Sequence, residues 1–247
     1  MERGIWIGKF ESTANNPTSD GTQKIKIKAN AQPWTYVDVY NSFNSGWNLD
    51  SNYGIINLDS HMTRYTEWTT MSYLTNSIYG LCKSSTSCTE VGANTSSSYM
   101  SGMGDYKTNA NLSTTGNITG IYDISGSAWE YVMGYLSETK GNSGFDTLPT
   151  DNKYTDIFTS SNTSTDRYSV ITHINGITSM NGVFDELLSD KTKKTSWYYD
   201  PAYSVYATYP WFRLGSHHGG GVGAGAFGSY YGVGGADSYG GFRVALS

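Results

Sequence analysis

The sequence has few charged residues, few prolines and almost no cysteine. Of its 247 residues only 15% are charged, against about 25% in a typical globular domain, and it contains five prolines and two cysteines. A net charge of −5 provides no basic field for a phosphate backbone, so we do not expect nucleic acid as a partner. The scarcity of proline argues against domains joined by proline-rich linkers, and the length suits one domain spanning residues 1–247.

Long apolar runs are also missing. No stretch approaches the roughly 18 apolar residues that span a bilayer, so we expect no membrane insertion by this chain. The first eleven residues, MERGIWIGKFE, lack the apolar core of a signal peptide. We therefore expect either that the protein is not secreted through a signal peptide or that the chain has been trimmed.

The two cysteines, Cys82 and Cys88, lie in the segment GLCKSSTSCTE. They are too few for a disulfide framework, and no histidine lies beside them to complete a zinc site. A disulfide between them would close a short loop and stabilise the fold by about 2 kcal/mol. Two free thiols are the alternative, and we favour the disulfide.

Uncharged polar and aromatic side chains are abundant instead, with 21 tyrosines among an aromatic content of 15%. The apolar run 5–7 is predicted to be a first strand, and 24–28 a second one, because its apolar and polar residues alternate strictly. Residues 168–172 are a third strand-like run. Residues 82–117 and 140–167 are rich in Ser, Thr, Asn and Gly and are predicted to be loops, with short strands possible in the first.

Two helices are predicted from apolar residues at helical spacing. The first has a stripe at i, i+3, i+4 and i+7, which Gly46 can end, formed by Tyr36, Val39, Tyr40 and Phe43. The second has Glu67 near its start and Gly80 as its cap, and its apolar face consists of Trp68, Met71, Leu74 and Ile78. Residues 183–188 are predicted to form one further helical turn.

The clearest internal motif is GIYDISGSAWEYV at residues 120–132. Its apolar residues flank a tight turn in which Asp123 or Ser125 can accept backbone N–H bonds and Gly126 can take a positive φ. We expect two core strands that meet at a corner, with Asp123 and Glu130 as hydrogen-bonding residues of the turn and the core edge.

The last 37 residues, 211–247, use a different set of amino acids from the rest of the chain. They contain no Lys, Glu, Gln, Met, Thr, Ile or Asn. A flexible, Gly-rich tail is the plain interpretation. The ending GFRVAL is typical of a strand that needs burial, however, so we favour a loop surface held between two anchored strands. The aromatic residues of 196–210 are spaced as though they cover a surface.

Three segments together resemble a known family: IWIGKFE at 5–11, GIYDISGSAWEYV at 120–132 and GFRVAL at 241–246. They are similar to the C-type lectin fold in the version shared by formylglycine-generating enzymes and by the variable proteins of diversity-generating retroelements. The resemblance covers nearly the whole chain. It implies an α+β fold in which two helices pack on small antiparallel sheets with long irregular loops.

In the retroelement-diversified proteins, a template rich in Asn codons is copied with errors at adenines, and the varied positions lie just before a terminal strand. An Asn codon mutated at its adenines reaches Ser, Gly, Tyr, His, Asp, Val, Ala, Phe, Leu and Arg, but not Lys, Glu, Gln, Met or Trp. The residues between Arg213 and Gly240 match this set. The resemblance therefore implies that 211–247 is a variable ligand-binding region.

Carried over position by position, the resemblance divides this region into two interleaved sets. The expected scaffold is Trp211, Phe212, Gly215, Gly221, Ala224, Gly225, Phe227, Gly234, Ala236, Gly241, Phe242 and Arg243, together with Trp129 and Asp123 of the central motif. The positions expected to vary and to contact ligand are Arg213, His217, His218, Gly219, Gly220, Val222, Gly223, Gly228, Ser229, Tyr230, Tyr231, Gly232, Val233, Gly235, Asp237, Ser238, Tyr239 and Gly240. Ser216 and Ala226 fit either set. The family pattern has Arg-Gly-Gly where this chain has Leu214-Gly215-Ser216, so we expect the loop to be anchored differently.

The implied function is ligand binding rather than catalysis. Tyr, Ser and Gly are also the residues of antibody paratopes, where Tyr supplies rigid contact area at low entropic cost. The expected contact anchors are Tyr230, Tyr231, Tyr239, His217 and His218, with Arg213 and Asp237 giving charge selectivity. The partner would be a protein or glycan on a target cell surface, and the chain would be extracellular, on a bacterial surface fibre, a pilus or a phage particle. The alternative is a static adhesin or pilus subunit that is not diversified.

Catalytic patterns are weak in this sequence. An oxidase of the formylglycine-generating type needs copper-binding cysteines in the C-terminal part of the fold, and residues 89–247 contain none. Asp185 and Glu186 are adjacent, so their side chains diverge, and a solvated face is a better interpretation than an acid–base pair.

Metal-binding patterns are equally weak. His217 and His218 would point in opposite directions on a strand, which favours two contact residues over a metal site. We expect His61 and His173 to be surface or hydrogen-bonded residues. We expect no cofactor. The scattered Asp and Asn side chains leave a structural calcium ion open, although no EF-hand spacing supports one.

Overall fold

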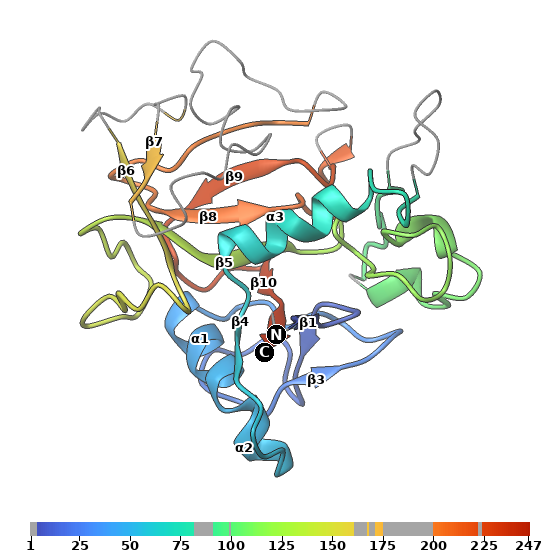
Figure 1. Ribbon diagram of the computed structural model, residues 1–247, viewed down its shortest axis with the longest axis horizontal. Coiled ribbons are helices and arrows are strands. Elements are labelled where there is room, and N and C mark those ends of the chain that lie inside the picture. Colours follow the sequence, from blue (N-terminus) through green and yellow to red (C-terminus); the bar gives the residue numbers. More distant parts are fainter. Residues whose placement is uncertain are drawn as a thin grey trace.

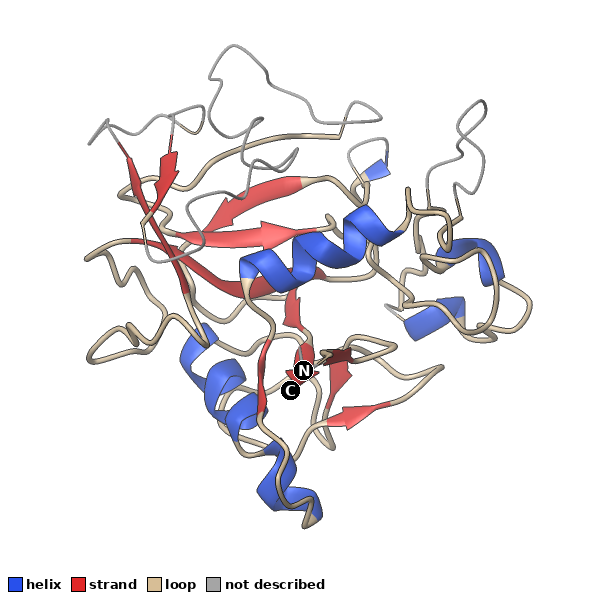
Figure 2. Cartoon of the chain, viewed as in Figure 1, coloured by secondary structure: helices blue, strands red, loops and turns tan. Residues whose placement is uncertain are grey.

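The computed structural model describes residues 4–81, 91–98, 100–160, 167, 171–174, 200–221 and 224–247. The predictions for Cys82, Cys88, Asp185, Glu186, the helical turn at 183–188, Val222 and Gly223 lie outside these residues. Within them the chain is a mixed α+β fold, with short helices, short strands and long connecting loops (Figure 2).

The elements follow one another along the chain in Figure 1. The first half contains β1 (Trp6–Ile7), β2 (Ser12–Thr13), β3 (Lys26–Ile27), α1 (Val39–Trp47), α2 (Leu49–Tyr53), β4 (Ser60–Met62), α3 (Tyr65–Leu74) and two 3-10 turns, η1 (Ser101–Met103) and η2 (Ala110–Leu112). The second half contains β5 (Trp129–Leu136), β6 (Asp156–Ser160), β7 (Ile171–His173), β8 (Trp211–Leu214), β9 (Ser229–Gly232), β10 (Gly240–Phe242) and β11 (Val244–Leu246).

The central sheet is organised around β5. Its strand order is β7-β6-β5-β8-β9, and β10 also pairs with β5. Since β8 pairs along one edge of β5, the other edge is shared by β10, at 129–131, and β6, at 134–136. Both of these pairings are parallel, whereas β5–β8, β6–β7 and β8–β9 are antiparallel, so the central sheet is mixed and the expectation of antiparallel sheets holds for it only in part. It holds for the smaller sheets β1-β11-β4 and β2-β3, and the first of these brings the two chain ends side by side (Figure 1).

Both faces of β5 and β8 are buried. Side chains alternate along β5, so Val132 packs in one hydrophobic cluster with Trp68 of α3, while Tyr131 packs in a second cluster with Val39 of α1. The neighbouring strand β8 divides in the same way, with Phe212 in the first cluster and Trp211 in the second. The two helices therefore cover opposite faces of the central sheet.

Helix α1 begins later than its apolar stripe predicted. It is capped by Asp38, which accepts the Asn41 N–H at 2.7 Å, whereas Tyr36 precedes the helix with a φ of +57°. The prediction that Gly46 ends the helix is wrong, because Gly46 is buried inside its last turn. A Cβ at Gly46 would lie 2.7 Å from the backbone nitrogen of Met62 in β4, so glycine permits this close approach.

Helix α3 is shorter than its predicted apolar face. Trp68 and Met71 are fully buried, as expected, but the helix ends at Leu74, and Ile78 lies beyond it with 73% of its surface exposed. Glu67 does lie at the helix start, where it accepts the Arg64 N–H at 2.9 Å. Gly80 does not cap the helix and instead donates its N–H to Ser77 in a later turn.

Strand predictions succeeded where the pattern is local. The strand at 5–7 is confirmed as β1, and the strand at 24–28 is present in part as β3. The apolar face predicted for 24–28 is only half right, because Ile25 is buried but Ile27 is 40% exposed. Strand β6 lies inside the segment that was predicted to be a loop at 140–167. The ending GFRVAL is not one strand but two, because the chain leaves the central sheet at Arg243 and joins the sheet with β1 and β4.

The turn of the central motif has the predicted geometry at its glycine. Gly126 has a φ of +79°, and Asp123, itself at a φ of +64°, accepts the Gly102 N–H. Of the two core strands expected at this corner, one is present as β5. The other is reduced to a single bridge between Tyr122 and Ser113.

Candidate ligand-binding surface

A buried arginine holds the C-terminal segment to the rest of the fold. Arg243 is fully buried and donates to both carboxylate oxygens of Glu130 on β5, at 2.6–3.2 Å. It also donates to the carbonyl oxygens of Gly8, at 2.7 Å, and Tyr122, at 2.8 Å. Glu130 in turn accepts the indole N–H of Trp68 at 2.9 Å, so the guanidinium and its carboxylate each have further buried partners besides one another.

Two further buried carboxyl groups surround this pair. Burial raises the pKa of Asp123 to about 6, and hydrogen bonds from Asn94 and Gly102 and the charge of Arg243 oppose that rise. Burial and the nearby carboxylates of Glu130 and Asp123 raise the pKa of Glu11 well above its usual value. Glu11 accepts bonds from Ser127 and the backbone of Ala128, which fixes the turn ahead of β5.

A second feature of the structure is a continuous set of aromatic rings, here called the aromatic strip. It consists of Tyr203, Tyr206, Tyr209, Tyr230, Tyr231, Trp129, His217 and Tyr239. Tyr231 of β9 is its centre, with ring centroids 5.0 Å from Tyr206 and 5.1 Å from Tyr209. Tyr230 continues the strip to Trp129, at 5.2 Å.

The far end of the strip is formed by His217 and Tyr239, whose ring centroids are 4.8 Å apart. Tyr239 is 45% exposed, and most of the strip is half-buried. Burial, followed by electrostatic interaction with His218 and Arg213, lowers the pKa of His217 below its usual value. His217 is therefore a neutral ring at physiological pH and presents an aromatic face with hydrogen-bonding nitrogens rather than a charge.

Arg213 and Asp237 bind each other instead of standing apart on the surface. The Arg213 guanidinium donates to the Asp237 carboxylate and to the Tyr131 hydroxyl, and it lies 4.3 Å from the centre of the Tyr131 ring. The second oxygen of Asp237 accepts the N–H groups of Tyr239, at 2.8 Å, and Gly240, at 2.7 Å. This pair therefore shapes the loop that carries Tyr239.

The positions expected to vary fall into three groups in the structure. Exposed or half-buried positions are Arg213, His217, His218, Gly219, Gly220, Tyr230, Tyr231, Val233, Gly235, Asp237, Ser238 and Tyr239. Buried positions are Gly228, Ser229, Gly232 and Gly240. The Ser229 hydroxyl donates to the Tyr203 carbonyl at 3.0 Å, and a Cβ at Gly232 would lie 2.5 Å from Arg213 Nε, so these two positions face the interior. Val222 and Gly223 belong to the residues that are not described.

Most of the expected scaffold is buried. Its buried members are Trp211, Phe212, Gly215, Gly225, Phe227, Gly234, Gly241, Phe242, Arg243 and Asp123, and Ser216 and Ala226 are buried with them. Its members that reach the surface are Trp129, Gly221, Ala224 and Ala236. Leu214, which departs from the family pattern, packs in the same hydrophobic cluster as Phe212. Trp129 belongs to the aromatic strip through Tyr230 and His217.

Residues upstream of 211 contribute to the surface and were not among the expected contact residues. Tyr203, Tyr206 and Tyr209 surround Tyr231, and the Arg167 guanidinium lies 4.7 Å from the Tyr203 ring centre. The aromatic spacing of 196–210 was the available signal for the three tyrosines. No local pattern marks Arg167, because its role depends on a contact far away in sequence.

The histidines of the described residues have protein partners. His61 is buried, with its Nε2 3.1 Å from both carboxylate oxygens of Glu67, in line with the hydrogen-bonded role expected of it. The Nε2 of His173 lies 3.2 Å from the Asp156 carboxylate. In the part of the chain that is described, no group of three or more His, Cys, Asp or Glu side chains is arranged to hold a metal ion.

The described residues thus form a mixed α+β protein that has an aromatic strip and a buried group of charged side chains around Arg243. A scan against models of protein families finds no match, and no curated protein matches the chain. Among the residues that the structure describes, no helix has the length and apolar character needed to cross a membrane.

Proposed function

We propose that this chain is a ligand-binding module that displays a diversified C-terminal surface on a scaffold of the C-type lectin type. The scaffold part of the proposal is supported by Arg243. Arg243 lies in 241–246 and its partners lie in the other two segments that carry the family resemblance, Gly8 in 5–11, and Tyr122 and Glu130 in 120–132. Segments far apart in the sequence thus share one buried hydrogen-bonding centre.

The binding part of the proposal rests on which residues of 211–247 are buried and which reach the surface. Large side chains of the expected scaffold, such as Trp211 and Phe242, are fully buried, whereas the expected anchors Tyr230 and Tyr239 line the aromatic strip. Aromatic rings with one polar end give rigid contact area at low entropic cost, and they are enriched where proteins bind other molecules. A partner protein or glycan on a target cell would cover this strip.

The Arg213–Asp237 pair changes the charge-selectivity part of the proposal. Each side chain neutralises the other, and Asp237 also holds the backbone at Tyr239 and Gly240. Variation at either position alone would leave the other charge without its partner, so these two positions are expected to act on loop shape as well as on ligand charge.

A pair of libraries on the full chain tests the proposal. The surface library varies His217, His218, Tyr230, Tyr231, Ser238 and Tyr239 over the residues that adenine-mutated Asn codons encode. The control library varies Gly228, Ser229, Gly232 and Gly240 in the same way. Both libraries are selected for binding to hen egg lysozyme as a defined probe. The melting temperatures of randomly chosen, unselected clones are measured for each library.

We expect most surface-library clones to melt within a few degrees of the parent and some to bind the probe, and most control-library clones to unfold. Surface clones that unfold as often as control clones, or a surface library without binders, would contradict the proposal.

A static adhesin is the second candidate, and one observation favours it. Tyr203, Tyr206 and Tyr209 form part of the aromatic strip although they precede the segment 211–247. The DNA around the gene decides between the two. A near-copy of the segment that encodes 211–247, with adenines at the varying codons and a reverse transcriptase gene beside it, supports diversification, and its absence supports the static adhesin.

A further inference from the structure

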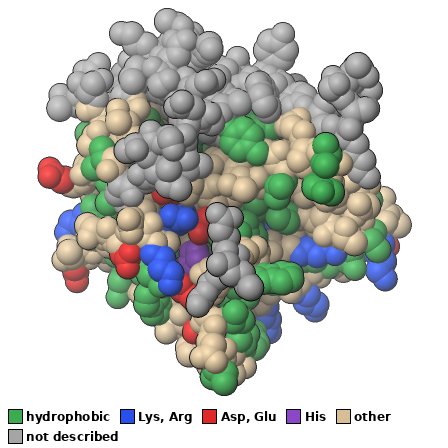
Figure 3. All heavy atoms as spheres, viewed as in Figure 1, with side chains coloured by type: hydrophobic (Ala, Val, Ile, Leu, Met, Phe, Trp, Pro, Cys, Tyr) green, Lys and Arg blue, Asp and Glu red, His purple; other side chains and the backbone are tan. Residues whose placement is uncertain are grey.

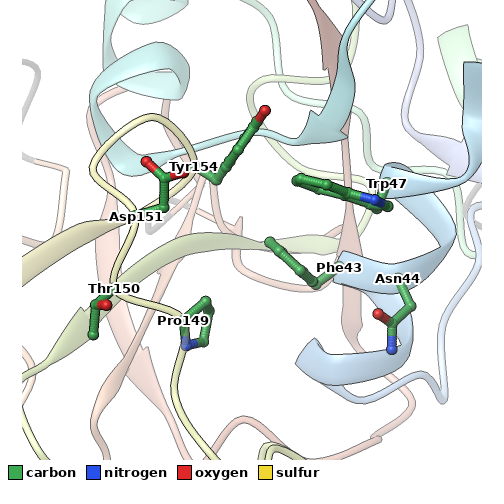
Figure 4. A pocket seen from close by; sticks show the side chains of 7 residues that line it. All are labelled: Phe43, Asn44, Trp47, Pro149, Thr150, Asp151 and Tyr154. Carbon is green, nitrogen blue, oxygen red and sulfur yellow. The ribbon is translucent and has the colours of Figure 1, made fainter.

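A pocket of about 400 Å³ lies between α1 and the segment that leads into β6. Helix α1 contributes Phe43, Asn44 and Trp47, and the other wall is formed by 149–151 and Tyr154 (Figure 4). None of these residues belongs to the aromatic strip or to 211–247. We propose that this pocket binds a neutral pyranose sugar, as a second site that is independent of the proposed function.

The first argument is the aromatic wall. The rings of Phe43 and Trp47 are 5.9 Å apart and inclined by 27°, and the Tyr154 ring meets Trp47 edge-on at 4.7 Å. Trp47 is 45% exposed, so part of its indole ring faces solvent at the pocket. The C–H face of a pyranose ring is flat and apolar enough to cover such a surface, while its hydroxyl groups stay at the edge.

The second argument is the set of polar groups around that wall. The side chains of Asn44 and Thr150 have no hydrogen-bond partner within the described residues, and neither does the indole N–H of Trp47. An amide and a hydroxyl can each donate and accept, and the Asp151 carboxylate accepts only. Sugar hydroxyls also both donate and accept, so this mixed set suits a polyol better than a ligand that only donates.

The third argument is charge. Lys153 is paired with Asp59, and its Nζ lies 5.0 Å from the centre of the Tyr154 ring, so a cation already occupies the neighbourhood of that ring. Lys153 opposes a second cation at that ring, with its charge offset in part by Asp59, and Asp151 opposes an anion in the pocket. Figure 3 shows acidic and basic side chains next to one another on this side of the molecule. A neutral ligand avoids both repulsions.

The fourth argument is that the polar wall is held in place before any ligand arrives. The Asp151 carbonyl accepts the Tyr154 N–H at 3.0 Å and the Thr155 hydroxyl at 2.8 Å. The Tyr154 hydroxyl donates to Asp59 at 3.1 Å, and the Pro149 carbonyl accepts the Tyr135 hydroxyl from β5. A preorganised wall lowers the entropic cost of binding a small ligand.

The test measures binding of methyl glycosides of glucose, galactose, mannose and N-acetylglucosamine to the full chain, by tryptophan fluorescence and by ligand-observed NMR. Tetramethylammonium and inorganic phosphate are the charged probes. We expect at least one glycoside to bind with a Kd of roughly millimolar order, and neither charged probe to compete with it. Preferential binding of either charged probe, or the absence of any glycoside binding, would overturn the proposal.

Two variants locate the site. Trp47→Ala should weaken glycoside binding by at least tenfold, with a modest drop in melting temperature from the lost contacts with Phe43 and Tyr154, whereas Trp47→Phe should retain most of the binding. Tyr239→Ala, in the aromatic strip, should leave glycoside binding unchanged. Full binding by Trp47→Ala, or loss through Tyr239→Ala, would refute a site in this pocket without bearing on the diversified surface.

Discussion

Replacement of Arg243 by methionine should be among the most destabilising single changes in the chain. The side chain is fully buried and donates to Glu130, Gly8 and Tyr122, so Arg243→Met leaves a buried carboxylate without its counter-charge and two carbonyl groups without their donor. Breaking a buried ion pair on one side typically costs about 3–5 kcal/mol. We expect a loss in that range in the free energy of unfolding at pH 7.5.

The cost should depend on pH in a direction that the buried carboxyl groups determine. The folded pKa of Asp123 is about 6 against a usual 3.8, so the folded state holds a proton that the unfolded state has released between those values. Stability therefore falls as pH rises through that window, by about 3 kcal/mol for roughly two pKa units. Arg243 opposes the rise in the pKa of both Asp123 and Glu11, so its removal makes the fall steeper.

Urea unfolding at pH 4.5 and pH 7.5 measures both effects. The cost of Arg243→Met should be larger at pH 7.5, because the raised pKa values of Asp123 and Glu11 keep these two carboxyl groups mostly protonated at pH 4.5. The matched control is Arg213→Met, which removes an arginine from a pair that is partly exposed and should cost about 1–2 kcal/mol. A cost below about 1 kcal/mol for Arg243→Met, or an equal cost at the two pH values, would refute the reasoning.

Two further predictions address Asp123, next to Arg243, and Gly46 of helix α1. Asp123→Asn removes one titrating group, so the free energy of unfolding should fall less between pH 4 and pH 6 than in the parent. Urea midpoints measured across this pH range test the prediction. An unchanged slope of stability against pH would mean that Asp123 does not titrate there. Gly46→Ala should lower the melting temperature, because the added Cβ would lie 2.7 Å from the backbone nitrogen of Met62. Helix propensity alone predicts the opposite, a gain of about 1 kcal/mol. A more stable variant would show that β4 moves aside at no cost.

Features that depend on neighbouring residues could be predicted from the sequence. Glu67 begins a helix because its carboxylate reaches an N–H three residues away, and Gly126 takes a positive φ because of the turn that it closes. The change in amino-acid vocabulary at 211 is likewise a property of the sequence alone.

Features that depend on distant residues could not be predicted. Gly46 follows an apolar stripe as a helix-ending glycine does, yet it lies inside α1 because β4 passes beside it. The segment 140–167 has the composition of a loop, yet β6 forms there because β5 offers it an edge to pair with. Arg213 and Asp237 were each expected to face a ligand, and only the meeting of β8 with the loop at 237 shows that they face each other.

The sequence by itself determined which residues in 211–247 are available: a tail rich in glycine and tyrosine, free of lysine and glutamate, and closed by an apolar ending. The tertiary structure decided which of them reach the surface. It turned Ser229 and Gly232 inward, paired Arg213 with Asp237, and brought Tyr206 and Tyr209 against Tyr231. The reason is that composition is fixed locally by the chain, whereas burial and charge pairing arise only from contacts between strands and loops that are far apart in sequence.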